Sequence, residues 1–156
     1  MQADEQTQFA AADRIIAMLR EHSITPTQPR VLIGGLLFRG PQHFSADQVL
    51  AGLGAAGREV SRATVYNTLG LFAERGLLRE VVVDPSRLFY DTNVDPHHHI
   101  FHTDTGVLED IATDQVGLTA FPMLPAHLRM EGVDIIIRVS DRMNSPESGA
   151  SLPTMD

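Results

Sequence analysis

The chain has 156 residues with no Cys, no Trp and no Lys, so all twelve basic side chains are arginine. Twenty acidic residues give a formal net charge of −8, and 43% of the residues are hydrophobic. These figures exclude a disordered or fibrous chain, a disulfide framework and any thiolate metal site. No apolar run approaches the ~20 residues of a membrane-spanning helix, and no charged-then-apolar leader opens the chain, so we expect a cytoplasmic protein without a membrane partner.

The charge is unevenly distributed along the chain. Residues 1–90 hold nine Arg and nine acidic residues, whereas residues 91–156 hold three Arg and eleven acidic residues and carry the whole −8. Residues 14–79 have a net charge of +4. An acidic chain is ordinarily a poor partner for nucleic acid. The asymmetry favours two functional parts, although chance clustering on solvated faces also explains the counts.

Three helices are predicted in the first part of the chain. Apolar spacing predicts a helix over about 5–21, and Thr27 is expected to cap a second one that ends near Phe38. Ser45-Ala46-Asp47-Gln48 matches a capping box that opens a short third helix before a glycine-rich loop. The residues expected to face inward are Phe9, Ala12, Ile15, Ile16 and Leu19, then Val31, Leu32, Gly35 and Leu36, then Val49, Leu50 and Leu53.

A fourth helix and a hairpin follow. Ser61 is placed to cap the helix, and Gly76 is placed to end it in the left-handed conformation. Residues 78–83 and 88–90 are predicted to form two strands around a turn. Helices followed by a two-stranded hairpin indicate a winged helix-turn-helix, which we assign to residues 1–90 as a DNA-binding domain. The buried stripe of the fourth helix is expected to be Val65, Leu69, Phe72 and Ala73.

The rest of the chain predicts a second, smaller domain, so the fold class is α+β. A polar hinge is expected at 91–96, a small α/β dimerisation and ligand-sensing domain at 97–142, and a disordered tail at 143–156. Its three-stranded sheet has one apolar face, which a second copy would bury in a homodimer; a monomer covered by the N-terminal helix is the alternative. Strands are expected at 97–103, 107–111 and 133–140, with a turn at Asp104-Thr105-Gly106 and at most a short helix between 113 and 130.

The exposed face of the fourth helix carries slender side chains. Ala63, Tyr66 and Asn67 lie opposite the buried stripe and suit base edges in the major groove of double-stranded DNA. In an isolated helix, packing of Tyr66 and solvation of Asn67 would explain them, but the neighbouring elements favour DNA contact. Arginines near the helix are candidates for phosphate contacts, although Arg30 could instead brace the helical core. The predicted DNA-binding residues are Arg30, Arg58, Arg62, Ala63, Thr64, Tyr66, Asn67 and Arg87.

Four histidines lie within six positions, at His97, His98, His99 and His102. Strand alternation puts His97 and His99 on one face, where two imidazoles can chelate one transition metal ion. The candidate metal ligands are His43, Asp91, His97 and His99. Mn, Fe or Zn would suit these nitrogen and oxygen donors. Imidazole is equally the usual axial ligand of haem iron, so His97, His98 and His99 are also candidate haem ligands.

These features together resemble the ferric uptake regulator family over roughly residues 9–140. The resemblance is carried by Ser61-Arg62-Ala63-Thr64-Val65-Tyr66-Asn67-Thr68-Leu69, by His97-x-His99 and by Gly106 at the start of a strand. Gly76-Leu77-Leu78-Arg79-Glu80-Val81, Tyr90-Asp91-Thr92-Asn93 and the three consecutive histidines most resemble its alphaproteobacterial iron response regulator branch.

The resemblance implies a homodimeric transcriptional regulator of iron and haem genes that binds an AT-containing palindrome and responds to haem or iron status. A regulator of the same family that responds to Mn, Fe or Zn is the alternative. A metal-binding enzyme or storage protein is the alternative from another class, but no second acid/base constellation supports an enzyme.

By position, the resemblance implies that Tyr66 contacts bases and that the four candidate metal ligands lie near the family's regulatory metal site. Asp91 is displaced by one position from the Glu that is usual among the ligands of that site. The chain also departs from the family. His102 and Thr105 stand where the family has a Cys-x-x-Cys pair, so a structural four-cysteine zinc is excluded. Pro96 and His98 replace the His and Asp of another family metal site. Haem binding through a Cys-Pro motif is impossible here, which leaves the histidine cluster.

Overall fold

The structure is a computed structural model that describes residues 2–141. The disordered tail predicted over 143–156 therefore lies outside the described residues. The chain divides into two compact units, residues 1–95 and 96–156, which are described separately below. No helix of the described range is long and apolar enough to cross a membrane.

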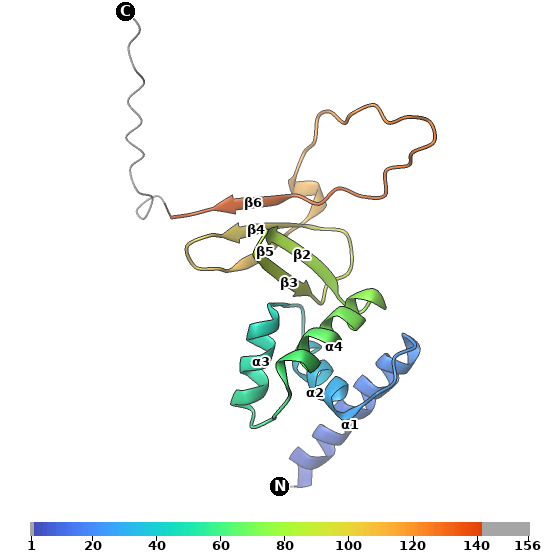
Figure 1. Cartoon of the computed structure of the whole chain (residues 1–156), viewed down its shortest axis with the longest axis vertical. Helices are drawn as coiled ribbons and strands as arrows, with labels where there is room; N and C mark the ends of the chain where they lie inside the picture. Colours follow the sequence, from blue (N-terminus) through green and yellow to red (C-terminus); the bar gives the residue numbers. More distant parts are fainter. Residues whose placement is uncertain (1, 142–156) are drawn as a thin grey trace, which may run out of the picture. The chain divides into compact units, whose positions relative to one another are not determined.

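The described part of the first unit contains four helices and a three-stranded antiparallel sheet of order β1-β3-β2. This is the winged-helix order predicted from the sequence, with one addition, the short strand β1 before the third helix. Figure 1 labels the helices and the strands β2 and β3. The elements are α1 (Gln2–Glu21), α2 (Gln28–Leu37), β1 (His43–Phe44), α3 (Ala46–Ala55), α4 (Arg62–Glu74), β2 (Arg79–Asp84) and β3 (Arg87–Asp91).

Capping residues define the ends of α3 and α4. The Ser45 hydroxyl accepts a hydrogen bond from the Gln48 backbone N–H, and the Gln48 side chain accepts one from the Ser45 N–H, which confirms the capping box. The Ser61 hydroxyl accepts from the Thr64 N–H at 3.1 Å and starts α4. Gly76 has φ +78° and follows the end of α4, as a left-handed terminator should. Thr27 occupies the N-cap position of α2 but makes no side-chain cap hydrogen bond.

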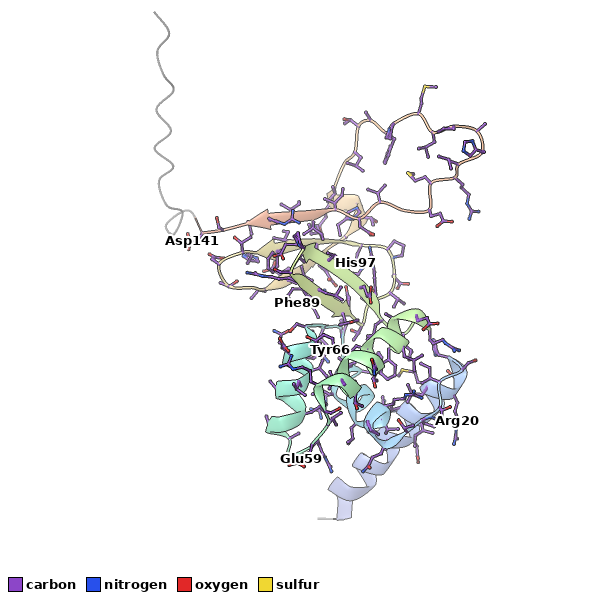
Figure 2. All side chains as sticks on the ribbon, viewed as in Figure 1. Arg20, Glu59, Tyr66, Phe89, His97 and Asp141 are labelled. Carbon is purple, nitrogen blue, oxygen red and sulfur yellow. The ribbon has the colours of Figure 1, made fainter. Side chains whose placement is uncertain are left out.

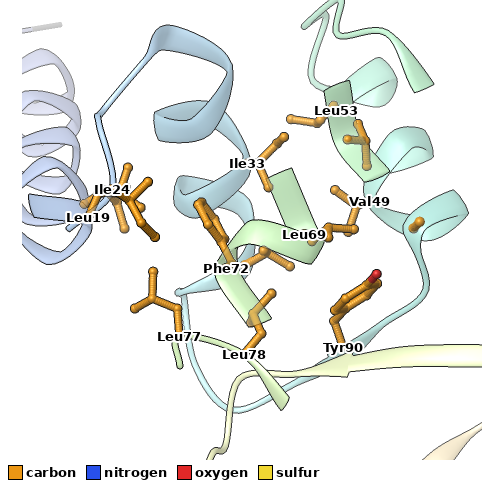
Figure 3. Close-up of a cluster of buried hydrophobic side chains, with 14 residues drawn as sticks. Leu19, Ile24, Ile33, Val49, Leu53, Leu69, Phe72, Leu77, Leu78 and Tyr90 are labelled. Carbon is orange, nitrogen blue, oxygen red and sulfur yellow. The ribbon is translucent and has the colours of Figure 1, made fainter. Parts of the chain in front are cut away.

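A single apolar core joins the four helices to the sheet (Figure 3). Ile15 and Leu19 of α1 are buried, whereas Ala12 and Ile16 are only half-buried, so the predicted stripe of α1 is confirmed in part; the side chain of Phe9 lies outside the described ones. Val65, Leu69 and Phe72 of α4 are buried, which confirms the main part of the stripe predicted there. The ring of Phe72 lies 6.2 Å from that of Phe38 between centroids. The core also contains Ile24, Ile33, Leu37, Ala46, Val49, Leu53, Leu77, Leu78 and Tyr90.

The inward face of α2 was predicted in the wrong phase. The buried residues are Ile33, Gly34 and Leu37, whereas Val31, Leu32, Gly35 and Leu36 are only half-buried. Residues 31–37 are all apolar or glycine, so no polar side chain marks the solvent face. Gly34 lies where a Cβ would come within 2.7 Å of Ile15 Cγ2, so a side chain there would separate α2 from α1.

Smaller errors of the same kind occur in the next two helices. Leu50 and Ala73 were expected to be buried and are only half-buried. Ala46 and Thr68 are buried instead. In each helix one residue of the predicted buried face is therefore exchanged for another. Burial in this small core follows the positions of neighbouring helices as well as the apolar pattern.

The described residues of the second unit, 96–141, form a three-stranded sheet of order β5-β4-β6, with the histidine-bearing strand in the middle. Its elements are β4 (His98–His102), β5 (Leu108–Ile111), the short 3-10 helix η1 (Thr113–Gln115) and β6 (Ile136–Val139). The β4–β5 pair is antiparallel and the β4–β6 pair is parallel. The predicted turn is present, with Gly106 at φ +73° and its N–H donating to the His102 carbonyl at 2.8 Å. Residues 116–135 form neither helix nor strand.

Candidate metal centre and nucleic-acid interface

The β4–β5 hairpin brings two histidines and one aspartate together. Antiparallel register places His99 directly opposite Asp110, and strand alternation puts His97 on the same side as His99. His97 Nε2 lies 3.2 Å from Asp110 Oδ1, and His99 Nε2 lies 3.6 Å from the same oxygen. The two imidazole rings meet edge to face with centroids 4.5 Å apart. We call this group the His97–His99–Asp110 triad.

The geometry of the triad fits a divalent transition metal ion. At metal–ligand bonds of about 2.0–2.1 Å, neighbouring ligand atoms of a tetrahedral ion are about 3.3 Å apart. The Nε2–Oδ1 distances of 3.2 and 3.6 Å in the triad have this spacing. Both histidines are buried, whereas the Asp110 side chain is 38% exposed, so Asp110 is the most solvent-exposed member of the triad. Nitrogen and oxygen donors of this kind suit Mn, Fe and Zn.

His98 and His102 lie on the other face of β4. The Ile135 N–H points at His98 Nδ1 from 3.4 Å. His102 Nε2 lies 3.0 Å from Glu109 Oε1, which is an ion-pair distance, but the contact does not meet hydrogen-bond geometry. The alternation predicted from the sequence is therefore present. As a consequence, the three candidate haem ligands do not project from one side of the strand.

The other two candidate metal ligands meet within the first unit. His43 on β1 is the cross-strand partner of Asp91 at the end of β3. His43 Nε2 lies 3.2 Å from Asp91 Oδ2, and Asp91 Oδ1 accepts a hydrogen bond from the Asn93 N–H at 2.8 Å. The Asp91 carboxylate is completely buried. Asp91, which the sequence analysis placed in the hinge, is thus the last residue of a strand.

Asp110 is the functional candidate that the sequence analysis missed. The sequence does contain the information that pairs Asp110 with His99, because the turn at residues 104–106 fixes the register of the hairpin. Counting back from that turn pairs Phe101 with Leu108 and His99 with Asp110. An acidic residue directly opposite a histidine of a candidate metal pair is a candidate third ligand.

The exposed face of α4 holds the predicted base-contacting side chains. Ala63, Tyr66 and Asn67 are exposed. Tyr66, which is labelled in Figure 2, is 46% accessible. Thr64 differs from them, because it is half-buried and its hydroxyl lies 2.8 Å from that of Ser61 at the start of the helix. This face combines an aromatic ring, an amide and a methyl group over one turn.

The four candidate arginines are exposed or half-buried and have different partners. Arg30 Nη1 donates to the Thr25 carbonyl at 2.9 Å and so braces the loop between α1 and α2. Arg87 Nε lies 3.4 Å from Asp84 Oδ2 across the β2–β3 turn. Arg58 is exposed in the loop that leads to α4. Arg62 is paired with Asp47 of α3, whose hydrogen bond and negative charge raise the pKa of the guanidinium.

Comparison with known proteins agrees with this architecture. The model of the Ferric uptake regulator family matches residues 21–120. The peroxide-responsive repressor PerR of Staphylococcus aureus is 31% identical over 101 residues, which cover 65% of this chain and 68% of that protein. The ferric uptake regulator from Pseudomonas aeruginosa with manganese superposes with a TM-score of 0.62 at 22% identity, over 82% of this chain and 98% of the other.

The ferric uptake regulator from Francisella tularensis with iron superposes with a TM-score of 0.63 at 23% identity, over 77% of this chain and 93% of the other. These likenesses confirm the predicted fold class, a winged helix-turn-helix followed by a small α/β unit. The family match covers most of the chain and includes both α4 and the triad. The chain belongs to the ferric uptake regulator family.

Proposed function

We propose that this chain is a metal-responsive transcriptional regulator that reads DNA with α4 and binds a divalent ion at the His97–His99–Asp110 triad. The observation that carries the proposal is the convergence of two imidazole nitrogens on one carboxylate oxygen, at 3.2 and 3.6 Å, in a member of this family. The family consists of regulators, which agrees with the expectation that the chain is not an enzyme.

The DNA-reading role of α4 is supported by its exposed face. Tyr66 and Asn67 are long enough to reach base edges, and Ala63 leaves room for a thymine methyl group between them. Neither Tyr66 nor Asn67 belongs to the apolar core. The predicted phosphate contacts by Arg30, Arg58 and Arg87, and the role of Thr64, stay predictions.

The ion is proposed to be Mn, Fe or Zn. Relatives of this fold have been solved with manganese and with iron, and the nitrogen and oxygen donors of the triad suit these metals. The haem hypothesis and membership of the iron response regulator branch stay predictions. Haem would have to bind through fewer than three of the consecutive histidines, because His98 faces away from His97 and His99. A Soret band that disappears in the His97→Ala, His98→Ala, His99→Ala triple variant would support haem.

The sequence-based prediction that His43 and Asp91 belong to the same ligand set as the triad also stays a prediction. The 3.2 Å distance between His43 Nε2 and Asp91 Oδ2 has the spacing of two ligand atoms on one ion, and it supports a shared ion for these two residues alone. His43→Ala should then weaken binding of Mn²⁺ or Zn²⁺, as measured by calorimetric titration. An unchanged affinity would remove His43 from the set.

A homodimer is the proposed assembly. Residues 116–135 carry large apolar side chains that are exposed in the single chain, among them Phe121, Met123 and Leu128. Such a surface is typical of a protein interface. A symmetric dimer would also present two copies of α4 to the two halves of a palindromic operator. Sedimentation equilibrium should give twice the chain mass, and Phe121→Ser should weaken the association.

The decisive experiment is selection of genomic DNA fragments by the purified protein at a stated salt concentration. The selection is run after dialysis against a chelator and again after addition of Mn²⁺, Fe²⁺ or Zn²⁺, with a parallel haem arm. We expect recovery of a discrete set of fragments that depends on the metal. The Tyr66→Ala, Asn67→Ala double variant should recover none of them and keep the wild-type thermal melt, because both side chains are exposed. Fragment recovery that the double variant retains would contradict the role of α4.

A further inference from the structure

An ion pair joins the N-terminal turns of α3 and α4. Arg62 is the first residue of α4, and its Nη1 atom contacts Oδ1 of Asp47 in the first turn of α3. Both side chains are largely exposed, at 63% for Arg62 and 68% for Asp47. Exposed pairs of this kind contribute little to folding stability. The main effect of the ion pair is therefore to fix the position of the Arg62 guanidinium.

Arg62 occupies a place that helix electrostatics disfavours. The N-terminus of a helix carries a partial positive charge, which repels a cation in the first turn. The first turn of α4 contains no acidic residue to offset this repulsion. The compensating charge comes from α3, where Asp47 is itself favourably placed at a helix N-terminus.

Tyr66 lies one helical turn beyond Arg62. Residues four apart on a helix are neighbours on its surface, so Arg62, which contacts the Asp47 carboxylate, is also a surface neighbour of Tyr66. The same two neighbours affect the pKa of Arg62. Asp47 raises the pKa of Arg62 most, and the Tyr66 hydroxyl adds to the effect through hydrogen bonding and charge. Asp47, Arg62 and Tyr66 thus form a row that leads from α3 onto the DNA-reading face of α4.

We propose that Asp47 is a positioning residue for DNA recognition: it holds Arg62 beside Tyr66, where the guanidinium orients the Tyr66 ring, and withholds it from the phosphates. The proposal rests on the proposed DNA-binding function and changes the predicted role of Arg62 from a phosphate contact to a support for base reading. Its consequence is specificity. Because Arg62 is held by Asp47, each protomer makes one fewer sequence-independent phosphate contact. In return, the Tyr66 side chain that reads bases has a fixed orientation.

The test uses Asp47→Asn with Glu59→Gln as the matched control. Both variants remove one negative charge near the start of α4, but Glu59 is exposed in the preceding loop and outside the row. Binding to a fragment recovered by the genomic selection, and to a scrambled DNA of equal length and composition, is followed by fluorescence anisotropy across a salt series in the full-length, metal-loaded protein.

Asp47→Asn should tighten binding to scrambled DNA. It should also steepen the slope of log K against log [salt] by about 0.9 per protomer, because one more phosphate is neutralised. The ratio of specific to scrambled affinity should fall severalfold. Glu59→Gln should leave that ratio unchanged. Arg62→Gln should weaken specific binding without changing the salt dependence on scrambled DNA, and the Asp47→Asn, Arg62→Gln double variant should be no worse than Arg62→Gln alone.

An Asp47→Asn protein with the wild-type specificity ratio would overturn the proposal. So would an Arg62→Gln protein with a shallower salt dependence on scrambled DNA, since Arg62 would then be a phosphate contact. A wild-type protein that does not distinguish the two DNAs would instead refute the DNA-binding function on which the proposal rests.

Discussion

Replacing Asp110 by Asn removes the negative charge of the oxygen that both histidines of the triad approach. Asp110 Oδ1 lies 3.2 Å from His97 Nε2 and 3.6 Å from His99 Nε2, so an ion held by the triad would bond to this oxygen. The neighbouring Glu109 on the same strand provides the control. Its carboxylate lies on the opposite face, 3.0 Å from His102, and Glu109→Gln removes the same charge.

The expected effect follows from the role of Asp110 as a direct ligand. Changing the groups that merely support metal ligands costs about 10–100-fold in affinity, so neutralising a ligand should cost at least the upper part of this range. At a metal concentration 100 times the wild-type Kd, binding stabilises the folded state by about 2.7 kcal/mol. After a hundredfold loss of affinity, the same concentration stabilises it by only about 0.4 kcal/mol. Asp110→Asn should therefore lose about 2.3 kcal/mol of metal-dependent stabilisation.

The assay combines calorimetric titration of Mn²⁺ and Zn²⁺ with urea unfolding in the presence and absence of each ion. Asp110→Asn and the wild type should unfold alike without metal and differently with it, whereas Glu109→Gln should follow the wild type in both conditions. Equal metal affinities for Asp110→Asn and the wild type would refute the triad as the binding site. An equal loss in Glu109→Gln would show that the effect is a general one of charge.

Three further predictions concern stability. Phe72→Ala should destabilise the first unit by about 3–5 kcal/mol in urea unfolding, because Phe72 is completely buried in the helical core. Ser45→Ala should cost about 1 kcal/mol in the same assay, because it removes the side-chain half of the capping box of α3. Burial, with a smaller effect of the Glu80 charge, raises the pKa of Tyr90 above its usual value. The raised pKa favours the folded state below about pH 10 and that contribution is lost as the pH rises further. The urea midpoint should therefore fall more steeply above pH 10 in the wild type than in Tyr90→Phe.

The sequence was most informative where one residue type decides the local structure. Ser45 and Ser61 mark the starts of α3 and α4 because their hydroxyls accept the backbone N–H groups that a helix leaves unpaired. Gly76 and Gly106 mark reversals because their positive φ angles favour glycine. The winged-helix order and the face of α4 follow from these markers together with the apolar spacing between them.

Features that depend on several segments were harder to predict. The buried face of α2 was missed because an all-apolar run does not indicate which side meets its neighbours. Strand β1 has only two residues, and within residues 2–141 it pairs with β3 alone, so no local pattern predicts it. Asp110 joins the triad through the register of the β4–β5 hairpin, and no pattern in the residues next to Asp110 marks it as a ligand. The partner of Arg62 lies fifteen positions away on another helix.

The parallel pairing of β4 with β6 has a consequence for the order of folding. The β4–β5 hairpin closes over a short turn, and hairpins form in about 1–10 μs. In contrast, the partners His99 and Ile136 are 37 positions apart in sequence, so β6 can add to the sheet only after a long loop has closed. The His97–His99–Asp110 triad is built entirely from the early hairpin and the residue before it. A metal ion can therefore bind while β6 is still unpaired. Temperature-jump relaxation, which resolves microseconds, should show a hairpin step that responds to metal, whereas the slower β6 step followed by stopped flow should be unaffected.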